Sequence, residues 1–309
     1  MKKFKIAFFD YPHWAIGKLN EQIAKRICDE HAVLDWSKQH ESSYIKSLLD
    51  SDYVFLTSGP GLFALHQQYK IPPDRIYVVS HDEDDFANMQ NNFYGRGVDL
   101  NDVLCSLRGL AVPSIQHVPS MLGKRIFRIP DVIQYGIDVG SWKFRERDQI
   151  ETVGACGAFS RPSNTTHPDC KRGYLIEKVA KETGLTLATT QCKLDSVVDW
   201  FDRIDLNMVA GVFEGGPLSP YEAAACGIPT IGTSAGSWIQ LVHMGAGCIV
   251  PYSSDKFIRE SVKLINYYRN NLEAYREMSH MVREEVQRFD WRHSIHTWVE
   301  FFENPSSGM

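Results

Sequence analysis

Residues 213–230 of the 309-residue chain read FEGGPLSPYEAAACGIPT, which predicts a strand end, a glycine-rich turn, a helix and the start of another strand. Ser219 is expected to cap the helix, with Pro220 at its first position and Glu222 three residues after Ser219, as in a capping box. Such a turn presents unpaired backbone N–H groups and the positive end of a helix dipole, which suit a phosphate or sugar hydroxyls. The carboxylates of Glu214 and Glu222 can accept hydrogen bonds from vicinal hydroxyls. The stretch is therefore a candidate ligand site in an α/β fold.

The same alternation of short apolar strands and amphipathic helices continues in both directions. It is typical of a parallel sheet that is covered by helices on both faces. Two successive series of this kind predict two Rossmann-like domains whose parallel sheets face a central cleft. The strands are predicted at Lys5–Asp10, Ala32–Trp36, Tyr53–Thr57, Ile76–Ser80, Leu110–Val112 and Ile126–Ile129, then at Glu151–Gly154, Leu185–Thr189, Leu206–Gly211 and Thr230–Gly232. The helices between them are predicted at Lys18–Glu30, Ser42–Asp50, Tyr174–Thr183, Ser196–Arg203 and Pro220–Cys226.

The domain boundaries follow from the charged, glycine-punctuated segment Tyr135–Ile150, which is predicted to link the two domains. We expect an N-terminal Rossmann-like domain at residues 1–142 and a second at residues 150–290, sizes that suit a chain of this length. Residues 291–309 are predicted to form a helix that packs back toward the first domain. Its apolar residues are Trp291, Ile295, Trp298 and Phe302.

Composition excludes several classes of protein. Hydrophobic residues make up 43% of the chain and charged residues 23%, which is ordinary for a globular protein. The formal net charge of -5 makes nucleic acid an unlikely partner, because neutralising phosphates requires a basic face. The seven scattered cysteines, with no Cys-x-x-Cys pair, fit reduced thiols. No apolar run approaches the roughly 20 residues that span a bilayer, so we expect a cytoplasmic protein, for which loose association with a membrane surface stays open.

The spacing of the two glutamates resembles that of a known family. Glu214, seven residues and then Glu222, followed by Ala-Ala-Ala-Cys-Gly-Ile-Pro-Thr, resembles the Glu-x7-Glu signature of glycosyltransferase family four, whose members are retaining enzymes of the GT-B fold. The resemblance implies that Glu214 contacts the sugar of a nucleotide-sugar donor and Glu222 the ribose. The alternative is that Glu222 only caps its helix and that Glu214 is a solvated turn residue. The turn residues expected to contact the donor are Gly215, Gly216, Pro217, Leu218 and Ser219.

Two elements of the first half resemble the family more weakly. His81, after the strand at Ile76–Ser80, resembles a histidine that lies near the donor sugar, and its alternative is a surface histidine that begins an acidic loop. Gly17 is expected in the loop after the first strand, where the family has a glycine-rich loop that approaches donor and acceptor; a plain turn is the alternative. Residues 134–138 read QYGID and resemble the element that closes the first domain, although Tyr135 stands where the family has asparagine.

A grip for the donor diphosphate is expected just after the first strand of the second domain. The family places an arginine and a lysine there, and charge-assisted contacts of this kind are strong. Arg161 and Lys171 are the best candidates, with Arg172 as a rival to Lys171. Because an inserted loop stretches their spacing, an ordinary loop cation is the alternative for each.

The resemblance implies a hexosyltransferase-type enzyme that moves a sugar from a UDP- or GDP-sugar to the hydroxyl of an unidentified acceptor, with retention at the anomeric carbon. No metal and no other cofactor is required by this prediction. A nucleotide-sugar epimerase, a DNA-modifying glucosyltransferase and a catalytically silent nucleotide-sugar-binding protein stay open as alternatives. A Rossmann dehydrogenase is disfavoured, because residues 11–17 (YPHWAIG) lack the Gly-x-Gly-x-x-Gly turn.

Overall fold

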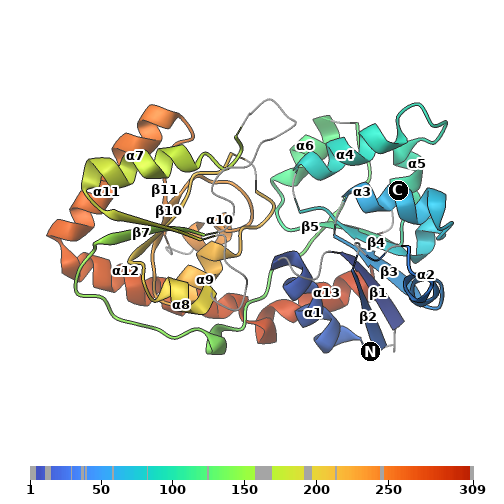
Figure 1. The fold of residues 1–309 in the computed structure, drawn as a ribbon, viewed down its shortest axis with the longest axis horizontal. Coiled ribbons are helices and arrows are strands. Elements are labelled where there is room, and N and C mark those ends of the chain that lie inside the picture. Colours follow the sequence, from blue (N-terminus) through green and yellow to red (C-terminus); the bar gives the residue numbers. More distant parts are fainter. Residues whose placement is uncertain are drawn as a thin grey trace. The chain divides into compact units, whose positions relative to one another are not determined.

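The computed structural model describes residues 5–10, 15–28, 30–35, 38, 40–57, 59–81, 83–123, 125–156, 169–190, 197–212, 214–243 and 247–306. The chain divides into two compact units. One consists of Met1–Tyr135 and Ser294–Met309, and the other of Gly136–His293. Each unit contains one parallel β-sheet with helices packed against it (Figure 1).

The first unit holds a six-stranded sheet in the order β2-β1-β3-β4-β5-β6, with every pairing parallel. Its strands are β1 (Lys5–Asp10), β2 (Glu30–Asp35), β3 (Tyr53–Leu56), β4 (Ile76–Val79), β5 (Gly109–Val112) and β6 (Asp131–Val132). Its helices are α1 (Ala15–Ile27), α2 (Ser42–Leu49), α3 (Gly59–Phe63), α4 (Glu83–Phe93), α5 (Leu100–Ser106) and α6 (His117–Gly123), with a π-helical turn at Ala64–Gln68 and a 3₁₀ turn at Pro73–Arg75. Every residue of β4 and β5 is buried, as expected of central strands in a parallel sheet.

The final helix, α13 (Trp291–Glu303), completes the first unit with aromatic side chains. The ring of Phe302 lies 5.5 Å from that of Phe55 on β3 and 4.8 Å from that of Tyr77 on β4, measured between ring centroids. The Tyr77 hydroxyl donates a hydrogen bond of 2.7 Å to the carbonyl of Phe302. Trp298 is fully buried and donates from its indole nitrogen to the carbonyl of Gln134 at 2.8 Å. The sheet therefore depends on this helix for part of its core.

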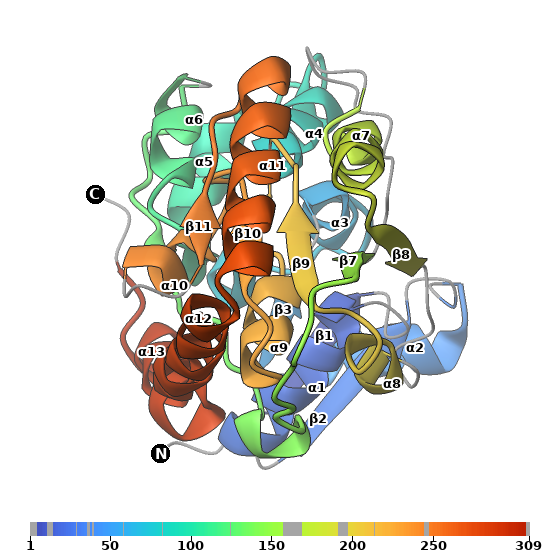
Figure 2. The same cartoon turned by 90° about the vertical axis from the view of Figure 1, so that its left-hand side faces the viewer.

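The second unit holds a five-stranded parallel sheet in the order β11-β10-β9-β7-β8, and Figure 2 shows these strands with α11 and α12 in front of them. Its strands are β7 (Thr152–Cys156), β8 (Thr186–Thr190), β9 (Leu206–Val209), β10 (Thr230–Gly232) and β11 (Cys248–Ile249). Its helices are α7 (Gly173–Thr183), α8 (Val197–Phe201), α9 (Ser219–Ala225), α10 (Ile239–His243), α11 (Ser254–Asn270) and α12 (Leu272–Glu285), with 3₁₀ turns at Val139–Ser141 and Val286–Phe289.

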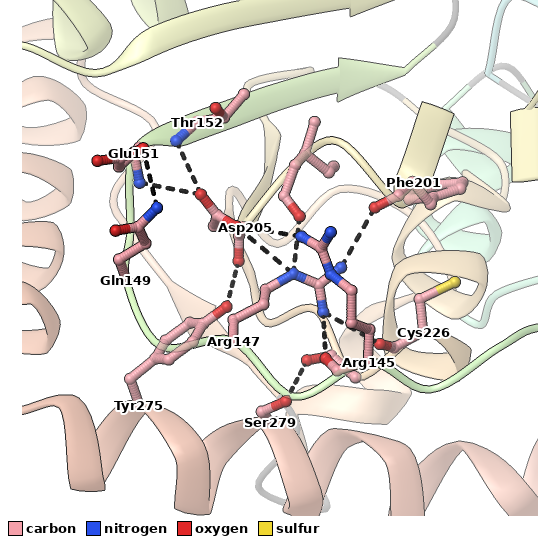
Figure 3. A network of polar contacts seen from close by, with 12 residues as sticks. Arg145, Arg147, Gln149, Glu151, Thr152, Phe201, Asp205, Cys226, Tyr275 and Ser279 are labelled. Atoms are coloured by element: carbon pink, nitrogen blue, oxygen red, sulfur yellow. Dashed lines mark hydrogen bonds and ion pairs between the residues drawn. The ribbon is translucent and has the colours of Figure 1, made fainter. Parts of the chain in front are cut away.

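The segment predicted as a linker lies within the second unit from Gly136 onward. Arg147 anchors it, because its buried guanidinium donates to the carbonyls of Ile204, Phe201 and Cys226 at 2.9, 3.2 and 3.3 Å (Figure 3). The same guanidinium lies 3.6 Å from the carboxylate of Asp205, which accepts hydrogen bonds from the two backbone N–H groups at the start of β7. Arg147 thus binds the carbonyl-rich ends of α8 and α9, where a helix dipole favours a cation.

Three predicted elements differ from the structure. The strand predicted at Ile126–Ile129 is wrong, and the edge strand is β6 instead. Backbone N–H groups in 126–127 bond to the carbonyl of Met121 and the side chain of Asn101 rather than to a neighbouring strand. The helix predicted from Lys18 begins at Ala15. The acidic residues after His81, which the alternative for that histidine placed in a loop, include Glu83, the first residue of α4 (Glu83–Phe93), whose buried Phe86, Met89 and Phe93 follow helical spacing.

Candidate functional site

The candidate site in the second unit lies at the point where the order of strands in the parallel sheet reverses. β7 begins the sheet, the chain then adds β8 on one side of it, and β9 pairs on the other side. Ligands of doubly wound sheets bind beyond the carboxyl ends of the strands at such a switch point. Lys171 belongs to the connection that leaves β7, and Glu214 to the connection that leaves β9. The topology therefore brings two candidate residues to the expected position.

Lys171 and Glu214 form an ion pair between Nζ and Oε1. The Lys171 side chain is 23% exposed and that of Glu214 is 12% exposed, so the pair is partly withdrawn from water yet reachable. The predicted alternative of a solvated turn residue is wrong for Glu214, because its carboxylate is mostly buried against a cation. The sequence did not predict this contact, since the two residues are 43 positions apart.

Two glycines make room for Glu214. A Cβ at Gly211 would come within 3.0 Å of the Glu214 carboxylate oxygen. Gly236 has a φ of +79°, and a Cβ there would lie 2.6 Å from the backbone carbonyl oxygen of Glu214. Only glycine adopts such a φ without strain, so Gly236 leaves room for the backbone of Glu214, while Gly211 leaves room for its carboxylate. Neither glycine was predicted from the sequence, although Gly236 falls in a run of small residues, 232–237 (GTSAGS), that signals a turn.

The glycine-rich turn leads into α9 in a different way from the prediction. Leu218 is already helical (φ -73°, ψ -27°), and its carbonyl accepts from the N–H groups of Tyr221 and Glu222, each at 3.0 Å. The prediction that Ser219 caps the helix is wrong, because a capping residue has an extended backbone and Ser219 lies inside the first turn. The N-cap residue of this helix is Leu218, whose side chain makes no capping hydrogen bond. The turn itself is tied down by the Ser237 N–H, which donates to the carbonyl of Gly215 at 3.2 Å.

Glu222 lies in the first turn of α9 and keeps part of its side chain accessible. Within the described part of the chain its carboxylate has no hydrogen-bond or ion-pair partner, so the alternative that it only completes a capping box is wrong. Loss of hydration in the surrounding protein raises the pKa of Glu222 to about 7. A half-buried carboxyl without an internal partner is suited to accept hydrogen bonds from a ligand.

Arg172 and Lys171 are adjacent but differ in environment. Arg172 has a left-handed backbone (φ 51°) and is buried, and its Nε and Nη1 donate to the carbonyls of Ala210 and Tyr252 at 2.7 and 2.6 Å. Burial lowers the pKa of Arg172. Two of its donor atoms therefore connect the segments that follow β9 and β11, whereas Lys171 turns toward Glu214. Arg161, the other predicted cation, lies outside the described residues.

In the first unit His81 lies two residues beyond β4, at the carboxyl edge of the sheet. It is buried, so the alternative of a surface histidine is wrong. Its Nδ1 is hydrogen-bonded to the hydroxyl of Tyr135, and the two rings stack with centroids 5.6 Å apart. Tyr135 is the residue at which the sequence departs from the family's asparagine.

Gly17 was predicted in a loop, and this prediction is wrong. Gly17 is buried within α1, two residues after the helix begins. A glycine costs a helix about 1 kcal/mol relative to alanine, but the neighbouring Leu19, Ile23 and Ala24 are buried in the core. Their burial outweighs the low helix propensity of one glycine.

Among the described residues, no three His, Cys, Asp or Glu side chains gather as metal ligands. A search of the same residues finds no helix with the length and apolar character that a membrane crossing requires.

Two parallel Rossmann-like sheets of this topology define the GT-B fold, and the predicted fold class is confirmed by comparison with solved structures. The chain is similar to HepE of Anabaena in complex with UDP and glucose, with a TM-score of 0.69 and 15% identity, over 97% of this chain and 100% of that chain. It is similar to sucrose-phosphate synthase of Thermosynechococcus elongatus, with a TM-score of 0.67 and 12% identity, over 97% and 98% of the two chains. OtsA in its apo form gives a TM-score of 0.64 at 9% identity, over 99% and 100%. No protein-family model and no curated protein matches the sequence.

Proposed function

We propose that the chain is a glycosyltransferase that moves a sugar from a nucleotide-sugar donor to an acceptor hydroxyl, with retention at the anomeric carbon. The observation that carries the proposal is the Lys171–Glu214 pair at the switch point of the second sheet. A cation for phosphate and a carboxylate for hydroxyls lie side by side there, as a nucleotide sugar requires. HepE, which shares the fold, has been solved with UDP-glucose and with UDP, which supports a uridine or similar nucleotide.

In the proposed reaction the bond between the anomeric carbon and the diphosphate oxygen breaks, and a bond to the acceptor oxygen forms. The acceptor proton passes to the departing phosphate oxygen, so the products are a glycoside and a nucleoside diphosphate. Lys171, together with Arg161, stabilises the charge that grows on the leaving diphosphate. The proposal requires no metal ion and no covalent nucleophile.

The remaining candidates hold the donor. Glu214 accepts hydrogen bonds from sugar hydroxyls, while Glu222 accepts them from the ribose. Backbone groups of the turn 215–219 approach the donor, since the two glycines carry no side chain. The ring of His81 is held by the Tyr135 hydroxyl, and its proposed role is to act on the transferred sugar.

A thermal-shift panel of UDP-, GDP-, ADP- and CMP-sugars tests the proposal. A ligand at about 100 times its dissociation constant stabilises the folded protein by roughly 2.7 kcal/mol. The donor that raises the melting temperature is then incubated with candidate acceptors and assayed for released nucleoside diphosphate. The absence of a shift with every donor contradicts the proposed function.

The role of Glu222 is tested by calorimetry. Glu222→Ala should weaken nucleoside diphosphate binding about ten- to a hundredfold, the cost of a hydrogen bond to a charged group. Glu277→Ala, an exposed change on α12, is the matched control and should bind as the wild type does. Equal affinity in folded Glu222→Ala would remove this residue from the site.

A further inference from the structure

The Lys171–Glu214 pair joins two groups that, under the proposed function, recognise different parts of one ligand. Lys171 is the cation for the diphosphate, and Glu214 is the carboxylate for the sugar. In the structure each satisfies the other. A ligand that takes one partner therefore leaves the other without its counter-ion.

The position of Glu214 is fixed by its surroundings. A methyl group at Gly236 would collide with the backbone of Glu214, and one at Gly211 would make a tight contact with its carboxylate. The Ser237 N–H donates to the carbonyl of the next residue, Gly215, and the Thr233 hydroxyl donates to the carbonyl of Gly211. Glu214 is thus built into the turn, while Lys171 reaches it with a long side chain. Opening the pair requires movement of the lysine rather than of the carboxylate.

We propose that Glu214 acts as an internal competitor of the nucleoside diphosphate for Lys171, so that the site holds a nucleotide sugar in preference to the nucleotide alone. This inference rests on the proposed function. A nucleotide sugar offers phosphate oxygens to Lys171 and hydroxyls to Glu214, so both charges regain partners. A nucleoside diphosphate offers phosphate oxygens only, and the mostly buried carboxylate then loses its partner.

The consequence appears after sugar transfer. Once the sugar has moved to the acceptor, the Glu214 carboxylate is free to pair with Lys171 again. Re-forming the ion pair removes a cation from the diphosphate and favours its dissociation. The pair thereby limits inhibition by the product, which matters because product release controls the turnover of many enzymes.

The test compares the affinities of UDP and GDP with those of UDP-glucose and GDP-glucose, measured by calorimetry. Glu214→Gln removes the competing charge, so it should tighten binding of the diphosphate about two- to fivefold, the value of a partly exposed ion pair. The same change should weaken or leave unchanged the binding of the sugar conjugate, because a carboxylate acceptor is lost. Glu277→Gln is the matched control and should change neither affinity.

A variant without Lys171 shows whether Glu214 acts on diphosphate binding through its competition for Lys171. In a Lys171→Met chain the diphosphate binds more weakly, and adding Glu214→Gln should no longer tighten it. Should Glu214→Gln prove unstable, Glu214→Asp provides the same test without a change in charge, since its shorter side chain draws the carboxylate away from Lys171. In a chain that keeps Lys171, that variant should also tighten diphosphate binding.

The outcomes are distinguishable. Tighter diphosphate binding that depends on Lys171 supports the competition. Equal or weaker diphosphate binding by folded Glu214→Gln overturns it while leaving the proposed function intact, provided that the wild type binds a nucleotide. A wild type that binds neither these four probes nor the ADP- and CMP-sugars of the thermal-shift panel overturns the proposed function and the competition together.

Discussion

Replacing Glu222 with glutamine should change how the stability of the protein depends on pH. The surrounding protein raises the pKa of this carboxyl from 4.5 to about 7. Between these two values the folded chain keeps a proton that the unfolded chain releases, so the folded state loses stability as pH rises through this window. With about 1.4 kcal/mol for each pH unit, the loss approaches about 3 kcal/mol at pH 8. Glutamine carries no ionisable proton and should abolish this loss.

Urea unfolding of the wild type and of Glu222→Gln at pH 5 and pH 8 measures the effect. At pH 5 the two proteins should be similar in stability, and at pH 8 the variant should be more stable by up to about 3 kcal/mol. Glu277→Gln, at an exposed position, should follow the wild type at both pH values. Parallel pH profiles of wild type and Glu222→Gln would contradict this prediction, because they would mean that Glu222 ionises at its ordinary pKa.

Three further predictions concern other parts of the structure. His81→Ala should lose most glycosyl transfer but keep nucleoside diphosphate affinity, and a fully active variant in a transfer assay contradicts its role. Gly236→Ala should lower the free energy of unfolding by about 1–3 kcal/mol from strain at positive φ, with a further loss because the new methyl group collides with the Glu214 carbonyl. Gly95→Ala, at φ +70° with open space around it, is the control that measures the strain alone. Arg147→Met should destabilise by about 3–5 kcal/mol in urea unfolding, because three carbonyls lose their buried guanidinium donor and Asp205 loses its nearer cation. Arg145→Met, whose side chain is 46% exposed, should cost less than about 1 kcal/mol.

The fold was predictable where local pattern and topology agree. The glycines and proline between Glu214 and Glu222 predicted the turn there. The strand β10 lies at the predicted residues Thr230–Gly232. The first residue of α9 was harder to predict. The sequence pattern placed the N-cap at Ser219, but in the structure the N-cap is Leu218, whose backbone is helical rather than extended. β6 was misplaced because Ile126–Ile129 has strand-like composition, while strand pairing depends on which backbone groups find partners in space.

The candidate site was predictable as a set of residue types but not as a set of contacts. The family resemblance pointed to Lys171 and Glu214 separately, and their pairing arises because β7 and β9 are neighbours in the sheet. Tyr135 could not be joined to His81 from the sequence, since 54 positions separate them. A sequence pattern reports neighbours along a helix or strand, whereas these side chains meet through the arrangement of whole elements.

The discontinuous make-up of the first unit has a consequence for synthesis on the ribosome. Residues 136–293 form an uninterrupted unit, so this unit can fold as soon as it has emerged. The first unit must wait for Ser294–Met309, because the rings of Trp298, Phe301 and Phe302 cover Phe55 and Tyr77. During that interval these apolar side chains of β3 and β4 are without their final cover, which makes the nascent first half a natural client for chaperones. An isolated N-terminal fragment would keep this exposed surface permanently, whereas the second unit can be excised as one piece.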